Sequence, residues 1–147
     1  MNGWLLDTNV IAELARVGGD ARVAAWAAAA NEDLLYISVL TLGEYDKGVA
    51  NLPDASPARA RIEASVASLE VRFEGRVLGV SDAIVRRWGR AVQRASRQPP
   101  PVIDTLLAAT AIEYDLRLVT RNTKDVKASG ATLFNPWQED AAGLGGP

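Results

Sequence analysis

The fold is decided by one stretch near the start of the chain, Trp4-Leu5-Leu6-Asp7-Thr8-Asn9-Val10-Ile11. Its apolar run ends at Asp7, and after a polar pair an apolar pattern with helical spacing begins. This order predicts a buried strand followed by a strand-to-helix turn, with Asp7 at the carboxyl end of the strand. Open α/β folds bind their ligands at that edge of the sheet, so Asp7 is the first candidate functional residue.

Further short apolar segments alternate with amphipathic stretches, which predicts a parallel sheet with helices on both faces. The expected strands after the first cover residues 34–38, 76–80, 117–120 and 132–134. The expected helices cover residues 10–17, 21–30, 41–52, 58–73, 82–96 and 103–114. We therefore expect one α/β domain over residues 1–140, with a central parallel sheet of about four to five strands, followed by a disordered tail at residues 141–147.

The composition bounds the possible chemistry. The 147 residues are 48% hydrophobic and 23% charged, with a formal net charge of −2, which fits one domain with a substantial core. No apolar run approaches the ~18 residues of a membrane span, and acidic residues interrupt any candidate signal peptide. The chain has neither cysteine nor histidine, which suits a cytoplasmic protein and excludes thiolate catalysis, Ser-His-Asp triads and His-ligated zinc. An enzyme of this composition would rely on carboxylates, lysines or a bound ion.

Four acidic residues stand where the predicted fold could bring them together: Asp7, Glu44, Asp104 and Asp125. Asp7 and Asp125 follow expected strands, Glu44 lies early in a helix, and Asp104 opens the helix after a proline run. At ~5 Å and an effective dielectric near 20, each pair of carboxylates repels by about 3 kcal/mol. A divalent cation neutralises such a cluster, and all-oxygen ligands favour Mg²⁺ or Mn²⁺.

Each of these acids also has a purely structural interpretation. Asp7 and Asp104 are typical helix caps, Asp125 is a typical turn residue, and Glu44 is a typical solvated helix acid. The metal-site hypothesis therefore rests on the placement of all four together.

Five segments carry a more specific pattern, and they cover nearly the whole chain. They are Leu5-Leu6-Asp7-Thr8-Asn9-Val10-Ile11, Ser38-Val39-Leu40-Thr41-Leu42-Gly43-Glu44, Asp104-Thr105-Leu106-Leu107-Ala108-Ala109-Thr110-Ala111, Leu118-Val119-Thr120-Arg121-Asn122-Thr123-Lys124-Asp125 and Leu133-Phe134-Asn135-Pro136-Trp137. In this order and spacing they resemble the PIN-domain family, in particular the VapC and FitB-type toxins of bacterial toxin–antitoxin pairs.

The resemblance implies a Mg²⁺-dependent endoribonuclease in which Asp7, Glu44 and Asp104 are the core catalytic and metal-binding acids. The fourth ligand position is open between two residues. Many PIN domains have it where this chain has Asn122, whereas this branch of the family also matches at Asp125. Asn122 could ligate through its carbonyl oxygen but brings no charge, so the number of bound metal ions also stays open.

The reaction expected from the resemblance is hydrolysis of a phosphodiester of structured RNA, such as tRNA or rRNA. Water activated by the metal would leave 5′-phosphate and 3′-hydroxyl ends. Hydroxyl and amide side chains beside the acids are expected either to orient the ligands or to serve as turn and cap residues: Thr8, Asn9, Thr120 and Asn122.

Basic residues in two places are candidates for RNA binding. Arg121 and Lys124 lie close to the acids in the sequence. A second set follows helical spacing and forms either a phosphate track or a solvated helix face: Arg86, Arg90 and Arg94.

The resemblance also implies a homodimer and a cognate VapB-like antitoxin that blocks the site. The helices between residues 41 and 73 would form the clamp for this antitoxin, with Leu42, Tyr45 and Val49 as groove residues or as core.

Three other interpretations compete with the nuclease. A haloacid-dehalogenase-like phosphatase needs a second Asp two residues after the first, where this chain has Asn9. A response-regulator receiver needs an acidic pair before its phosphorylated Asp, and none is present. A PIN-like module that binds RNA or protein without cutting stays open.

Overall fold

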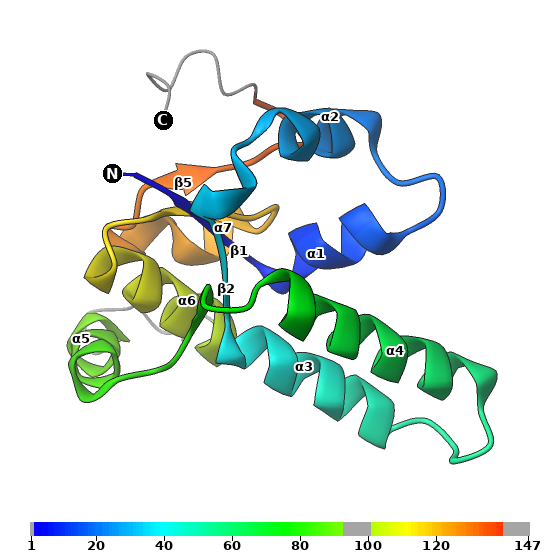
Figure 1. The fold of residues 1–147 in the computed structure, drawn as a ribbon. Coiled ribbons are helices and arrows are strands. Elements are labelled where there is room, and N and C mark those ends of the chain that lie inside the picture. The colour runs from blue at the N-terminus through cyan, green and yellow to red at the C-terminus, as the bar shows by residue number, and fades with distance from the viewer. Residues whose placement is uncertain (1, 93–100, 140–147) are drawn as a thin grey trace.

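The structure is a computed structural model that describes residues 2–92 and 101–139. Within these ranges five strands and seven α-helices form the fold (Figure 1). The strands are β1 (Trp4–Leu6), β2 (Leu35–Ser38), β3 (Val77–Leu78), β4 (Arg117–Val119) and β5 (Leu133–Phe134). The helices are α1 (Thr8–Ala15), α2 (Ala21–Ala29), α3 (Val39–Ala50), α4 (Pro57–Arg72), α5 (Asp82–Val92), α6 (Val102–Glu113) and α7 (Thr123–Val126). The tail predicted at residues 141–147 and the predicted helix end at 93–96 lie outside the described residues.

The strands form one parallel sheet in the order β3-β2-β1-β4-β5. This confirms the predicted α/β architecture. β1 lies in the middle, where Trp4 is opposite Leu35 on one side and Arg117 on the other. The chain adds strands on one side of β1 and then on the other, so the strand order changes direction next to Asp7. Open α/β sheets bind ligands at such a point.

Side chains of β1 alternate between two cores, one on each face of the sheet. Trp4 and Leu6 pack with residues of α1 and α2, whereas Leu5 packs with Leu107 of α6. Burial on both faces explains why β1 is a continuous apolar run in the sequence. β1 ends at Leu6, so Asp7 stands where the backbone leaves the sheet and α1 begins.

Three aromatic rings fill the first of these cores. The rings of Trp4, Trp26 and Phe134 lie with their centroids 5.3–5.4 Å apart, in edge-on and tilted arrangements. Such contacts stabilise beyond the buried area alone. They join β1, α2 and β5, which are far apart in the sequence.

Polar caps determine where several helices begin. Asp20 accepts hydrogen bonds from the first backbone N–H groups of α2, as predicted. The start of α3 was predicted two residues too late. Ser38 Oγ accepts from Leu40 N at 3.0 Å, so the helix already begins at Val39.

Helices α3 and α4 run side by side and extend from the sheet as a hairpin (Figure 1). The base of this hairpin is held by Phe73, which is buried, and by Arg76. The Arg76 guanidinium donates to the carbonyl oxygens of Leu35 (2.7 Å) and Arg72 (2.6 Å) and stands 4.9 Å from the Phe73 ring centroid.

On the opposite face α5 packs against α6, and Trp88 Nε1 donates to Thr105 Oγ1 at 2.9 Å. In the part of the chain that the structure describes, no helix has the length and apolar character required to cross a membrane.

Candidate active site

Asp7 occupies the centre of the carboxyl edge of the sheet. Its Oδ1 accepts from Thr8 N at 2.6 Å and caps α1, so the structural interpretation of this residue is confirmed. Its Oδ2 accepts from Thr120 Oγ1 at 2.7 Å and from Asn9 Nδ2 at 3.2 Å. The residue is 4% exposed, and this burial raises its pKa above the usual value, although the hydrogen bonds oppose the shift. Asp7 is therefore a buried carboxylate held in one orientation.

Thr120 organises the surroundings of Asp7. Its hydroxyl donates to Asp7 and accepts from Asn122 N at 3.0 Å and from Asn9 Nδ2 at 3.3 Å. The hydroxyl thus uses its one proton and both lone pairs. Asn9 and Thr120 therefore both bond the Asp7 carboxylate, and the Asn122 backbone is linked to it through Thr120.

Glu44 reaches the site from α3. Its Oε1 accepts from Thr8 Oγ1 at 2.7 Å, and the same hydroxyl lies 3.0 Å from Thr41 Oγ1. Thr41 is fully buried and stands one helical turn before Glu44. The sequence analysis did not assign Thr41 to the site, although its position three residues before an acid on a helix is a usable signal.

Asp104 lies in the first turn of α6, next to the other acids. The cap interpretation of Asp104 is wrong, because the N-cap of α6 is Pro101. Burial, and then the carboxylates of Asp7, Asp125 and Glu44, raise the pKa of Asp104 to about 6, while a hydrogen bond with Asn122 lowers it. The charged groups that act on Asp104 are thus the three other predicted acids.

Asn122 and Asp125, the two candidates for the fourth position, both lie near Asp104. Asn122 caps α7 and hydrogen-bonds with Asp104, whereas Asp125 lies inside α7 and acts on Asp104 by its charge. Both side chains are exposed. The four acids lie at one edge of the sheet. Within residues 2–92 and 101–139, however, no three acidic side chains are close enough together to bind one metal ion in the arrangement seen here.

Comparison with known protein families assigns the chain, because the family model of the PIN domain matches residues 4–129. The chain belongs to the PIN-domain family. This PIN domain is 31% identical to Toxin FitB of Neisseria gonorrhoeae over 137 residues. The alignment covers 92% of this chain and 99% of that protein. It is 32% identical to VapC ribonuclease Y4jK of Sinorhizobium fredii over 140 residues. That alignment covers 91% of this chain and 97% of that protein.

Solved structures agree with this assignment. This PIN domain aligns with a chain of the structure of FitAB bound to the IR36 DNA fragment with a TM-score of 0.82 and 29% identity. The alignment covers 93% of this chain and 97% of that chain. The fold predicted from the five motifs is therefore the observed one.

The predicted RNA-binding residues of this PIN domain lie in two separate places. Arg121 donates its backbone N–H to Asn9 Oδ1 at 3.3 Å, but its guanidinium lies 5.2 Å from the Trp137 ring centroid. Lys124 is exposed on α7, between Asn122 and the end of that helix.

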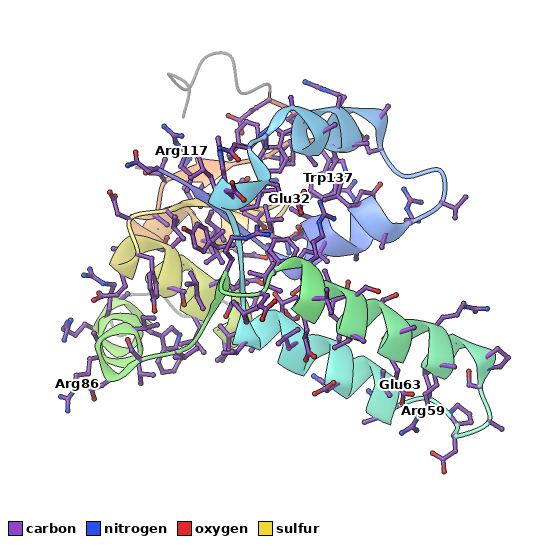
Figure 2. The ribbon with its side chains drawn as sticks, in the orientation of Figure 1. Glu32, Arg59, Glu63, Arg86, Arg117 and Trp137 are labelled. Atoms are coloured by element: carbon purple, nitrogen blue, oxygen red, sulfur yellow. The ribbon has the colours of Figure 1, made fainter. Side chains whose placement is uncertain are left out.

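Of the predicted arginine stripe, the structure describes Arg86 and Arg90. Arg86 Nε bonds both carboxylate oxygens of Asp82, at 2.9 and 3.0 Å, and Figure 2 shows Arg86 at the outer side of α5. Arg90 is exposed on the same helix, and Arg94 lies outside the described residues. An exposed ion pair of this kind is worth at most about 1 kcal/mol and leaves Arg86 free to exchange partners, so the RNA-binding role of the stripe stays a prediction.

Proposed function

We propose that this PIN domain is a Mg²⁺-dependent endoribonuclease, the toxin of a toxin–antitoxin pair, which cuts structured RNA such as tRNA or rRNA. One observation carries the proposal: the carboxylates of Asp7, Glu44 and Asp125 all act on Asp104, although the four come from separate segments. A gathering of like charges costs stability unless a cation offsets it. The relatives that are named as a toxin and as a VapC ribonuclease support the reaction class.

The donor set fits Mg²⁺ in its chemistry, because the site offers carboxylate oxygens and the Asn122 carbonyl without nitrogen or sulfur ligands. Asp7, Glu44, Asp104 and Asp125 would hold the ion. Asp7 and Glu44 are already fixed by hydrogen bonds from Thr120 and Thr8. Asp104 and Asp125 would complete the set by side-chain rotation, since repulsion keeps the carboxylates apart without a cation.

The residues of the chain have distinct tasks in the proposed reaction. Mg²⁺, when bound, would lower the pKa of a water molecule and would offset charge on the phosphate. Thr120 and Asn9 hold Oδ2 of Asp7 in place through their hydrogen bonds, and Thr8 does the same for Oε1 of Glu44. Hydrolysis would leave 5′-phosphate and 3′-hydroxyl ends without any histidine.

The same proposal includes an antitoxin bound between α1, α3 and α4, and the FitAB complex supports such a partner. A mainly apolar pocket of about 330 Å³ lies there, and its walls include Leu6, Leu14 and Leu69. Leu6 directly precedes Asp7, so a segment that fills the pocket lies beside the acids. Of the predicted groove residues, Tyr45 lines this pocket.

The other two groove candidates belong to the packing of the molecule. Leu42 is half-buried against the first core, and Val49 is a buried core residue.

The test of the nuclease uses protein free of antitoxin on total tRNA and rRNA, with Mg²⁺ or with EDTA. Asp104→Asn removes one ligand charge, and Asp33→Asn, at an exposed turn, is the matched control. We expect discrete cuts with 5′-phosphate ends that vanish in EDTA and in Asp104→Asn but persist in Asp33→Asn. Folded protein that binds RNA without cutting it would instead establish the non-cleaving module.

A further inference from the structure

A groove on the outer face of α3 is not used by the function proposed above. It has a volume of about 480 Å³ and runs between α3 and the first turn of α6. Its lining residues are Val39, Leu40, Gly43, Glu44, Lys47, Gly48, Asn51 and Ile103. Glu44 belongs both to this groove and to the acid cluster, so the groove adjoins the candidate active site directly.

We propose that this groove is a nucleotide subsite, which binds the RNA strand beside the scissile bond through Lys47. The inference rests on the proposed nuclease function and adds a substrate-binding residue to it.

Charge is the first argument. Lys47 stands one turn after Glu44, about 4.5 Å further along the helix axis. It is exposed, and within the described residues no ion pair involves it. The carboxylates of the acid cluster repel the RNA phosphates that flank the scissile bond. A free ammonium at this distance offers the neighbouring phosphate an attractive contact.

Room for the strand is the second argument. At Gly43 and Gly48 no atom lies within 4 Å of the position that a Cβ would take, so the α3 backbone is open to close approach. Leu40 and Ile103 provide apolar surface for the flat face of a base. Asn51, two turns after Glu44, can both donate to and accept from a base edge.

A second copy of this chain is the other candidate occupant. Protein interfaces are depleted of charged residues at their cores, particularly lysine and glutamate. Here the exposed Lys47 lines the groove, and its ammonium group attracts a hydrated polyanion more than an apolar protein face does.

The first test measures RNA binding in the Asp104→Asn background, which separates binding from cutting. The probe is a short single-stranded RNA of random sequence, in Mg²⁺ and at several salt concentrations. Lys47→Gln should weaken binding about fivefold and reduce the magnitude of the log–log salt slope by about 0.7. Lys47→Arg should restore both values, and Arg22→Gln on α2, an exposed residue that loses the same charge, should leave them unchanged.

The second test fills the groove without endangering the fold. Gly48→Leu replaces a poor helix former in open space, so its melting temperature should equal or exceed that of the parent. Binding should nevertheless weaken, and in the cutting protein KM should rise while kcat stays within twofold. Ala67→Leu, which adds a leucine to an exposed position of α4, is the matched control.

The outcomes separate the two proposals. Unchanged binding in both Lys47→Gln and Gly48→Leu would overturn the groove subsite while leaving the nuclease intact. If Lys47→Gln or Gly48→Leu changed the molecular mass in ultracentrifugation but left binding per site unchanged, the groove would be a contact between copies. This outcome would also overturn the subsite. Binding that depends on Lys47 in a protein that never cuts would support the subsite and overturn the nuclease.

Discussion

Asp104 is the side chain whose pKa is raised by all three of the other acids of the site. Its pKa is raised from 3.8 to about 6, so between these pH values the folded state binds more protons than the unfolded state. The free energy of unfolding of the ion-free protein therefore decreases as pH rises through this window, by at most about 3 kcal/mol from this group. Above the window the contribution is constant and unfavourable.

Asp104→Asn removes that cost, and we expect it to stabilise the ion-free protein at pH 7.5. Its melting temperature in EDTA should exceed that of the wild type, by about 2–4 °C for each kcal/mol recovered. At pH 4, near the lower end of this window, Asp104 is protonated in the folded state and only partly ionised in the unfolded state, so the difference should largely disappear. Thermal denaturation followed by circular dichroism tests this, with Asp33→Asn as control. An equal difference at both pH values would contradict the raised pKa.

Asp7 shows how much a single residue reveals in the sequence. Its cap role and its position at the strand end were both predicted, because each depends only on neighbours in the chain. Its hydrogen bond to Thr120 joins residues 113 positions apart, and only the pairing of β1 with β4 brings these two together. The alternatives for Asp7 were therefore not exclusive: one oxygen caps the helix and the other faces the site.

At the scale of elements, the α3–α4 hairpin depends on a small anchor at its base. Arg76 donates to carbonyl oxygens from two segments and stacks on Phe73. Arg76→Lys keeps the charge but loses the planar fork that serves several acceptors at once. We expect the free energy of unfolding to fall by about 1–3 kcal/mol, since half-buried carbonyl groups lose their donors.

Urea denaturation measures this loss, and Arg61→Lys on the exposed side of α4 provides the control. Because the anchor is remote from the acids, RNA cutting at low temperature should be nearly unchanged. An Arg76→Lys protein as stable as the wild type would show that the hairpin is held by Phe73 packing alone.

The pattern of apolar residues predicts the strands, including the short ones, but it does not predict the short helix α7. β1 and α6 bury whole runs of apolar residues, and α2 buries Val23 and Trp26 at helical spacing, so these elements have clear patterns. α7 has four residues, where the sequence pattern predicts only a turn after the fourth strand. Nothing local distinguishes one helical turn from an irregular turn, because its formation depends on Val126 packing into the core beneath α6.

At the scale of the whole molecule, the proposed cation should act as a stabilising ligand. A ligand at 100 times its Kd stabilises the folded state by about 2.7 kcal/mol. We expect Mg²⁺ to raise the melting temperature of the wild type at pH 7.5 by several degrees and to have little effect on Asp104→Asn. KCl of equal ionic strength controls for screening. The same shift in both proteins would indicate a general salt effect and count against a specific site.

The parallel sheet and the single domain followed from the alternation of apolar and amphipathic segments along the chain. The outer groove did not, because it exists only where α3 and the start of α6 meet. Ile103 and Lys47 are 56 positions apart by their residue numbers, and no local pattern connects them. Surfaces made by two distant elements are the part of a site that sequence patterns reveal least.

The central position of β1 has a consequence for the synthesis of the protein. Its partner β2 emerges early from the ribosome, but β4, on its other side, follows only after more than a hundred residues have been translated. Asp104 and Asp125 are made in the same late portion. A growing chain therefore carries half of the acids and an unpaired strand edge, and the site assembles only when translation is nearly finished. For an enzyme that would cut components of the translation machinery, activity would arise only as the chain that bears it is completed.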